Sequence, residues 1–156
     1  MRTPCLRPPV VAPITDHFRD PCTYCPGNRG LEYGVAPGVP VRAMATGRVS
    51  FSGLVAGIRY LVVDHGDGLR ATYGGLRTSH LSTGDAVVAG AVVGVTGATL
   101  HVGVRRGERY LDPEPLIGRL VIRPYLVPTD GTRRRAAPPR LICPAAAGRS
   151  NASGGR

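Results

Sequence analysis

The stretch that decides the fold reads Tyr60-Leu-Val-Val-Asp64, then His65-Gly-Asp-Gly68, then Leu69-Arg-Ala-Thr-Tyr73. Two runs rich in β-branched and aromatic residues flank an Asp-Gly step, which is a strong hairpin signal because tight hairpin turns need positive φ angles. Other short apolar runs alternate with turn signals along the chain, at Val41–Ala43, Arg48–Val55, Arg59–Asp64, Ala86–Val88, Val92–Thr96 and Leu100–Arg105. No window keeps a 3.6-residue apolar period. The pattern predicts an all-β domain, a small antiparallel sheet or sandwich with long loops.

The composition excludes two large classes of protein. The chain has 156 residues, about the length of one domain. It contains 22 Gly and 15 Pro, which is hard to reconcile with long helices because Pro breaks a helix interior and Gly weakens it. No apolar run approaches the ~18–20 residues of a membrane span. We therefore expect neither a mainly helical protein nor an integral membrane protein.

The positive charge gathers toward the C-terminal end, and all 20 basic residues are Arg. Residues 119–156 hold eight Arg against one acid, whereas residues 1–118 hold twelve against nine acids. The sequence predicts three parts: a Pro-rich segment over 1–13, a β domain over 14–118 and a basic tail over 119–156, rich in Pro, Ala and Arg. A tail so poor in bulky apolar residues is expected to be disordered, although Leu120–Val127 can dock on the sheet.

A charge run of this kind is usually a solvated segment. The alternative is an electrostatic contact with an anionic polymer or a membrane surface. Aromatic residues do not interleave with the Arg residues after Tyr125, which argues against a stacking surface for nucleic acid. We expect no nucleic-acid partner and a monomeric protein.

Four stretches together resemble one family: Gly38–Gly53, Leu61–Tyr73, Ser82–Gly97 and Leu100–Arg105 with the following Asp112-Pro113. In this order they are similar to the lysostaphin/LytM-type zinc metallopeptidases, which are peptidoglycan endopeptidases with a small antiparallel β core. The resemblance covers about residues 10–116. It implies the LytM-type fold and an extracytoplasmic place at the cell envelope. The first residues of the chain lack the apolar stretch of a secretory signal, so a cytoplasmic interaction domain is the alternative.

The family's motifs locate a candidate site. Its His-x-x-x-Asp motif, which supplies two zinc ligands, aligns with Asn28 and Glu32. Its strand motif Pro-His-Leu-His-Phe-Glu supplies the third ligand from the second His, here His101. The resemblance thus implies a remnant metal site of Asn28, Glu32 and His101. The family's two catalytic histidine positions are occupied by Thr99 and Gly75.

These substitutions argue against catalysis. The Glu carboxylate reaches up to roughly 1.5 Å further than that of Asp, and an amide oxygen is a poorer zinc ligand than imidazole. Loss of each acid–base or charge-stabilising group costs about 10²–10⁴ in rate. We expect a pseudoenzyme without a cofactor, which binds peptidoglycan peptides or regulates a cell-wall hydrolase through a groove that includes Tyr33 and Tyr73.

Two other interpretations of the same residues stay open. The chain could be an active zinc endopeptidase with an Asn28, Glu32 and His101 ligand set. Alternatively, Asn28 and Glu32 merely hydrogen-bond a loop, and His101 is an ordinary half-buried strand histidine.

Cys22 and Cys25 are expected to form a local disulfide that braces the Asn28 loop, provided that the protein is exported. A thioredoxin-like motif is disfavoured because Pro26-Gly27 follows where a helix should begin. A zinc knuckle would need a second ligand pair, and only Cys5, Cys143 and the nearby His17 remain. His65 is expected in the hairpin turn.

Overall fold

The computed structural model describes residues 3–133 and 135–145, and the regular secondary structure within them consists of strands and one 3-10 turn. The elements are β1 (Ile14–Asp16), β2 (Leu31–Tyr33), β3 (Pro40–Arg42), β4 (Gly47–Val55), β5 (Ile58–Asp64), β6 (Leu69–Thr78), β7 (Ala86–Val87), β8 (Val92–Arg106), β9 (Arg109–Leu111), the 3-10 turn η1 (Glu114–Leu116), β10 (Arg119–Val121) and β11 (Arg140–Ile142). This confirms the all-β prediction. No helix among the described residues is long and apolar enough to cross a membrane.

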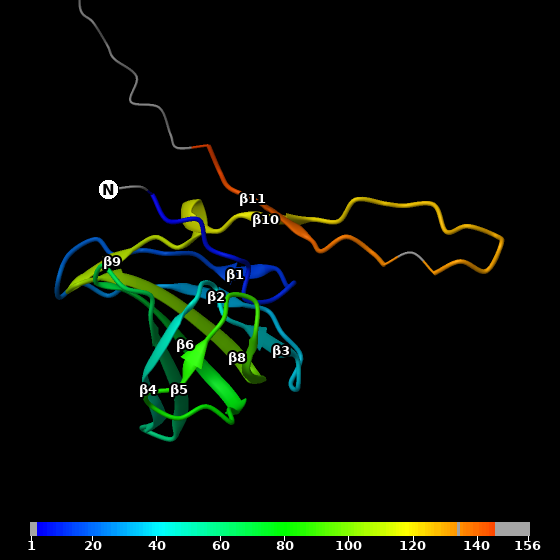
Figure 1. Ribbon diagram of the computed structural model, residues 1–156. Helices are drawn as coiled ribbons and strands as arrows, with labels where there is room; N and C mark the ends of the chain where they lie inside the picture. Colours follow the sequence, from blue (N-terminus) through cyan, green and yellow to red (C-terminus); the bar gives the residue numbers. More distant parts are fainter. Residues whose placement is uncertain (1–2, 134, 146–156) are drawn as a thin grey trace, which may run out of the picture.

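Nine of the strands form one antiparallel sheet, with the order β1-β2-β8-β6-β5-β4-β7. Strands β3 and β9 also pair with β8, so β8 pairs with four other strands, β2, β3, β6 and β9 (Figure 1). The predicted hairpin joins β5 to β6, with positive φ at Asp67 (51°) and Gly68 (72°). His65 lies in this turn, as expected, and its backbone N–H donates to the Leu69 carbonyl at 2.8 Å.

Strand β8 is longer than the sequence predicts. The sequence predicts two separate runs, Val92–Thr96 and Leu100–Arg105, but the chain continues through Gly97 and Ala98 as one strand. A Cβ on Gly97 would lie 2.8 Å from the Gly75 carbonyl oxygen. Gly97 therefore permits a close backbone approach to β6, where the pairing register shifts, rather than a turn.

The core lies on one side of the long strands, because side chains alternate between the two faces of a strand. In β6 the buried members are Leu69, Ala71 and Tyr73, and in β8 they are Leu100, Val102 and Val104. Their neighbours in sequence, including Thr72, His101 and Arg105, are directed to the opposite face and are partly exposed. That opposite face carries the candidate site.

The N-terminal segment is part of the domain. Leu6 and Val10 are 1% and 8% exposed and belong to the core. The Leu6 backbone N–H donates to the Leu116 carbonyl at 2.8 Å, and Gly118 donates to the Leu6 carbonyl at 2.8 Å. Residues before position 14 therefore pack in the same core as the sheet.

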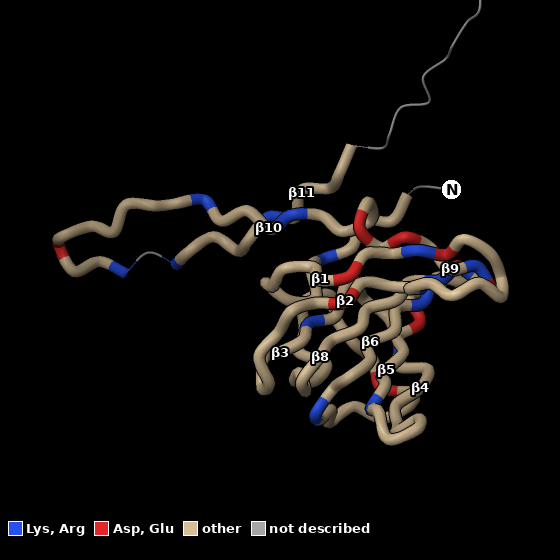
Figure 2. The backbone as a smooth tube through the Cα atoms, turned by 180° about the vertical axis from the view of Figure 1, so that it is seen from behind, with Lys and Arg blue, Asp and Glu red and all other residues tan. Residues whose placement is uncertain are grey.

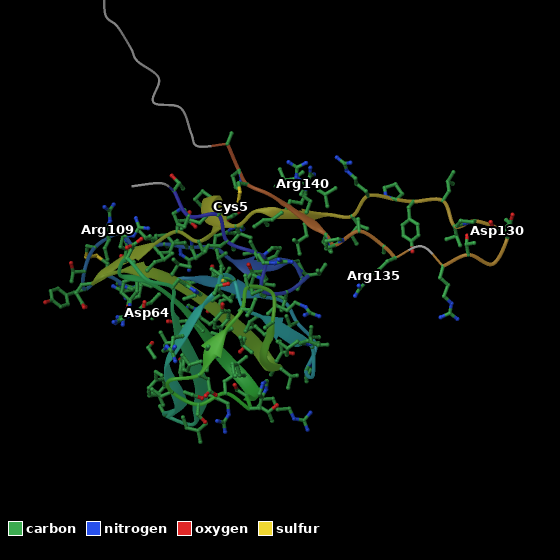
Figure 3. All side chains as sticks on the ribbon, in the orientation of Figure 1. Cys5, Asp64, Arg109, Asp130, Arg135 and Arg140 are labelled. Atoms are coloured by element: carbon green, nitrogen blue, oxygen red, sulfur yellow. A yellow bond between two sulfur atoms is a disulfide. The ribbon has the colours of Figure 1, made fainter. Side chains whose placement is uncertain are left out.

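The C-terminal region contains structure that the prediction of a disordered tail did not include. Strands β10 and β11 pair, and the described residues between them extend away from the sheet (Figure 1). Several Arg positions lie along this region (Figure 2). A disulfide joins Cys143, just after β11, to Cys5 near the N-terminus (Figure 3). The remaining tail residues, 134 and 146–156, lie outside the described part of the chain.

Candidate functional site

A pocket of about 410 Å³ opens on the face of the sheet opposite the core. It is lined from β2, β5, β6, β8 and β9, by residues that include Glu32, Tyr60, Thr99, His101, Arg105 and Tyr110. Four of the predicted site positions, Glu32, Gly75, Thr99 and His101, lie in this lining. The fold therefore brings them together from separate strands. We call this pocket the groove.

Glu32 and His101 form a side-chain hydrogen bond in the groove. They are register partners on β2 and β8, and Glu32 Oε1 lies 2.5 Å from His101 Nδ1. Their side chains are 34% and 30% exposed. Gly30 makes room for the imidazole, because a Cβ at this position would lie 2.7 Å from both Cε1 and Nε2 of His101. The ring is thus held between the β2 carboxylate and the Gly30 backbone.

Asn28 forms hydrogen bonds within the loop before β2. It is only 8% exposed. Its backbone N–H donates to the Arg19 carbonyl at 2.8 Å, and its own carbonyl accepts from Arg19 at 2.7 Å. Its side-chain Nδ2 is directed to the Asp16 carbonyl at 3.5 Å, which is long for a hydrogen bond. The amide group therefore faces the loop backbone as a donor.

Glu32 Oε1 and His101 Nδ1 lie too close together to be joint ligands of one zinc ion in this arrangement. Two ligand atoms on a tetrahedral zinc lie about 3.3 Å apart, since Zn–N and Zn–O bonds are about 2.0–2.1 Å. Glu32 Oε1 and His101 Nδ1 are closer than this, at hydrogen-bond distance from each other. Within residues 3–133 and 135–145, no group of three or more His, Cys, Asp or Glu side chains could hold a metal ion.

The position of one family catalytic histidine cannot accept a side chain without rearrangement. Gly75 has φ +84°, and a Cβ placed on it would lie 2.5 Å from the Thr99 carbonyl oxygen. Both the backbone conformation and the space favour glycine. Thr99, at the other catalytic position, is exposed in the groove and offers a hydroxyl group rather than an imidazole.

The prediction that Tyr33 and Tyr73 line the groove is wrong. They are 6% and 0% exposed and belong to the core. The Tyr73 hydroxyl accepts a hydrogen bond from the Met44 backbone N–H at 2.8 Å. Burial raises the pKa of Tyr33 to about 12 and also raises that of Tyr73. The reason is strand alternation: Glu32 faces the groove, so its neighbour Tyr33 faces the core, and Thr72 and Tyr73 are related in the same way.

Two other tyrosines form the aromatic walls of the groove. Tyr60 pairs with Gly74 in the sheet, and a Cβ on Gly74 would lie 2.6 Å from the Tyr60 ring. Tyr110 pairs with Arg105 on the short strand β9. Sequence reasoning missed both because the register between strands, and not a motif, places them there. Tyr60 could have been found by counting alternate residues from buried Leu61 and Val63.

One end of the groove is basic. Arg29, immediately after Asn28, is fixed by an ion pair from Nε to Asp20 Oδ1 at 3.3 Å and a hydrogen bond from Nη2 to the Thr23 carbonyl at 2.9 Å. Its Cζ lies 5.7 Å from the centre of the Tyr110 ring, within the range of a cation–π contact. The Thr23 loop is closed by a disulfide between Cys22 and Cys25. This loop holds the Arg29 guanidinium at the groove.

The nine-stranded antiparallel sheet, its long strand β8 and the groove over Glu32 and His101 define a LytM-type peptidase fold. Residues 26–113 match the family model of Peptidase family M23, and the chain belongs to this family. The fold is similar to that of Helicobacter pylori Csd3, with a TM-score of 0.66 and 25% identity over 73% of this chain and 35% of Csd3.

Two curated relatives extend the comparison. The chain is 31% identical to the uncharacterized protein Rv2891 of Mycobacterium tuberculosis over 97% of its length, and it spans 66% of that relative. It is 33% identical to the murein hydrolase activator EnvC of Escherichia coli over 58% of its length, corresponding to 24% of EnvC. The chain therefore spans about two thirds of one relative and a quarter of the other.

Proposed function

We propose that this chain is a non-catalytic M23 domain that binds a peptidoglycan peptide in the groove. The observation that carries the proposal is the direct hydrogen bond between Glu32, which replaces the family Asp, and His101, the retained family His, because each group is engaged by the other. The steric exclusion of a side chain at Gly75 adds to it, since a catalytic imidazole has no place there. Both features support binding without cleavage.

The groove has the properties that an extended peptide needs. Gly74, Gly75 and Gly103 leave its floor without side chains, which lets a bound backbone approach the sheet closely. Tyr60 and Tyr110 offer apolar walls, and the hydroxyl groups of Thr72 and Thr99 offer hydrogen bonds to amides. Such a mixture of apolar walls and a few polar groups is typical of ligand sites.

We place the domain at the cell envelope. Both disulfides support this location, because disulfides persist in oxidising compartments outside the cytoplasm. EnvC, by its name an activator of murein hydrolases, supports a second role for the same groove, in which the ligand is part of a cell-wall hydrolase. Addition of the domain to a purified murein amidase would test this role through the rate of muropeptide release.

The main test is a sedimentation assay with insoluble peptidoglycan, performed together with an assay for released peptides. We expect binding without release, with or without added Zn²⁺. Glu32→Ala should weaken binding, because it removes the partner that orients the His101 ring. Glu108→Ala, the same change at an exposed acid outside the groove, should bind as wild type. Zinc-dependent peptide release would instead establish the active endopeptidase with the Asn28, Glu32 and His101 ligand set.

A further inference from the structure

The guanidinium of Arg105 lacks a compensating charge among the described residues. Arg105 lines the groove and is partly exposed, and its Nε is closed to solvent without a hydrogen-bond partner in residues 3–133 and 135–145. No carboxylate of the described chain lies within ion-pair distance of it. A partly buried cation without a partner is costly, so an anion that reaches it gains a strong interaction.

Two acids of this region, Asp64 and Asp20, are paired with other arginines. Asp64 accepts from Arg70 Nε at 3.2 Å and from the Gly66 backbone N–H at 2.9 Å, and both contacts lower the pKa of its carboxyl group. Arg70 on β6 is the register partner of Arg105. Asp64 therefore pairs with Arg70 and not with Arg105. Asp20 pairs with Arg29 in the same way. These two acids therefore neutralise Arg70 and Arg29, and neither is paired with Arg105.

Arg29 adds a second cation at this end of the groove. It contacts the ring of Tyr110, and Tyr110 is the register partner of Arg105 on β9. Because Asp20 and Thr23 fix the Arg29 guanidinium, its position is set before a ligand arrives. Two arginines therefore line the same end of the groove, and a guanidinium group suits a planar anion such as a carboxylate.

We infer that Arg105, with Arg29 beside it, is a subsite for a carboxylate of the peptide bound in the groove. Because Nε of Arg105 is closed to solvent, a ligand reaches the two Nη groups. These two groups can donate to the two oxygens of one carboxylate. Arg105 stands four residues from His101 on β8, about 13 Å along the strand. An extended peptide of about four residues spans this distance, with its amides at Glu32 and His101 and its carboxylate at Arg105. The inference rests on the proposed peptide-binding function.

The test is isothermal titration of the full chain with the tetrapeptide L-Ala-γ-D-Glu-meso-diaminopimelate-D-Ala, with its carboxylates free or all converted to carboxamides. We expect the free acid to bind about 10–100-fold more tightly, the value of one charge-assisted pair. Arg105→Gln should remove this preference and leave weak binding of the carboxamide unchanged. Arg105→Lys should keep part of it, since the charge remains but the fork is lost. Arg77→Gln, at an exposed position on β6, is the matched control and should behave as wild type.

The outcomes separate the two proposals. Equal binding of both peptides by wild type, or a preference that survives in Arg105→Gln, overturns the carboxylate subsite and leaves the peptide-binding function standing. Failure of both peptides to bind wild type overturns the proposed function and the subsite with it. A thermal unfolding curve for each variant shows whether a loss of binding reflects a loss of the fold.

Discussion

A methyl group added at Gly30 should displace the imidazole of His101. The added Cβ would lie 2.7 Å from Cε1 and Nε2 of the ring and 2.5 Å from the Val102 carbonyl oxygen. The carbonyl belongs to the backbone of β8, so it cannot rotate away as a flexible side chain could. Either the ring leaves Glu32 or β2 separates locally from β8. Overpacking of this kind costs about 1–3 kcal/mol.

Gly103 provides the matched control, because it is a second glycine near the same ring but with more space around it. A Cβ there would be 3.5 Å from His101 Nε2 and 3.4 Å from the Arg29 carbonyl, which is ordinary or slightly tight contact. We expect Gly30→Ala to lower the melting temperature by about 2–12 °C, from the cost above and the size of the chain. Gly103→Ala should lower it by much less.

Differential scanning calorimetry and the NMR signals of the His101 ring would measure the two effects. Gly30→Ala should also shift the ring signals and weaken peptidoglycan binding, while Gly103→Ala should keep the wild-type ring signals. If Gly30→Ala melted with wild type and kept the Glu32–His101 contact, the packing of the ring against Gly30 would not determine the geometry of the site.

Two further predictions concern stability. Replacing Cys5 and Cys143 by Ser should cost up to about 5 kcal/mol by chain entropy, because this disulfide closes a separation of 138 residues, whereas replacing Cys22 and Cys25, three residues apart, should cost about 2 kcal/mol; equal losses in urea unfolding would contradict the entropic reasoning. His65 is a pH-dependent element, since burial lowers its pKa from the usual 6.5 while the unfolded chain keeps the usual value. The unfolded chain therefore takes up a proton first, and stability should fall as the pH drops below about 6.5, until the folded pKa is reached. His65→Asn should flatten this part of the profile of unfolding free energy against pH, and an unchanged slope would show that His65 is not its source.

The hairpin and the main strands could be predicted because their signals are local. The Asp67-Gly68 turn and the runs on either side needed no information from elsewhere in the chain. The continuity of β8 could not be predicted in this way, because Gly97 has the same local appearance in a turn and at a close backbone approach. Strands β2 and β9 are three residues long, too short for a period to show, and long-range pairing with β8 is what forms them.

The site residues that belong to a family motif could be predicted from the sequence, whereas those placed only by strand pairing could not. The positions of Glu32, Thr99 and His101 followed from the family pattern, and the structure places all three at the groove. Tyr33 and Tyr73 were misplaced because each lies one residue from a groove position, and a shift of one residue reverses the face of a strand. Arg105 and Tyr110 carry no motif, so only the pairing of β8 with β9 shows their position. The Cys5–Cys143 bond was unpredictable because its two members lie near opposite ends of the sequence.

That bond also gives the domain a mechanical property. Cys5 and Cys143 enclose nearly all of the described chain, including every strand of the nine-stranded sheet. Tension applied to residues 3 and 145 would pass from one backbone segment to the other through sulfur, and the strands between would carry almost no load. The sheet would stay folded under a pull that ruptures ordinary hydrogen-bonded strands, until a reductant cuts the link.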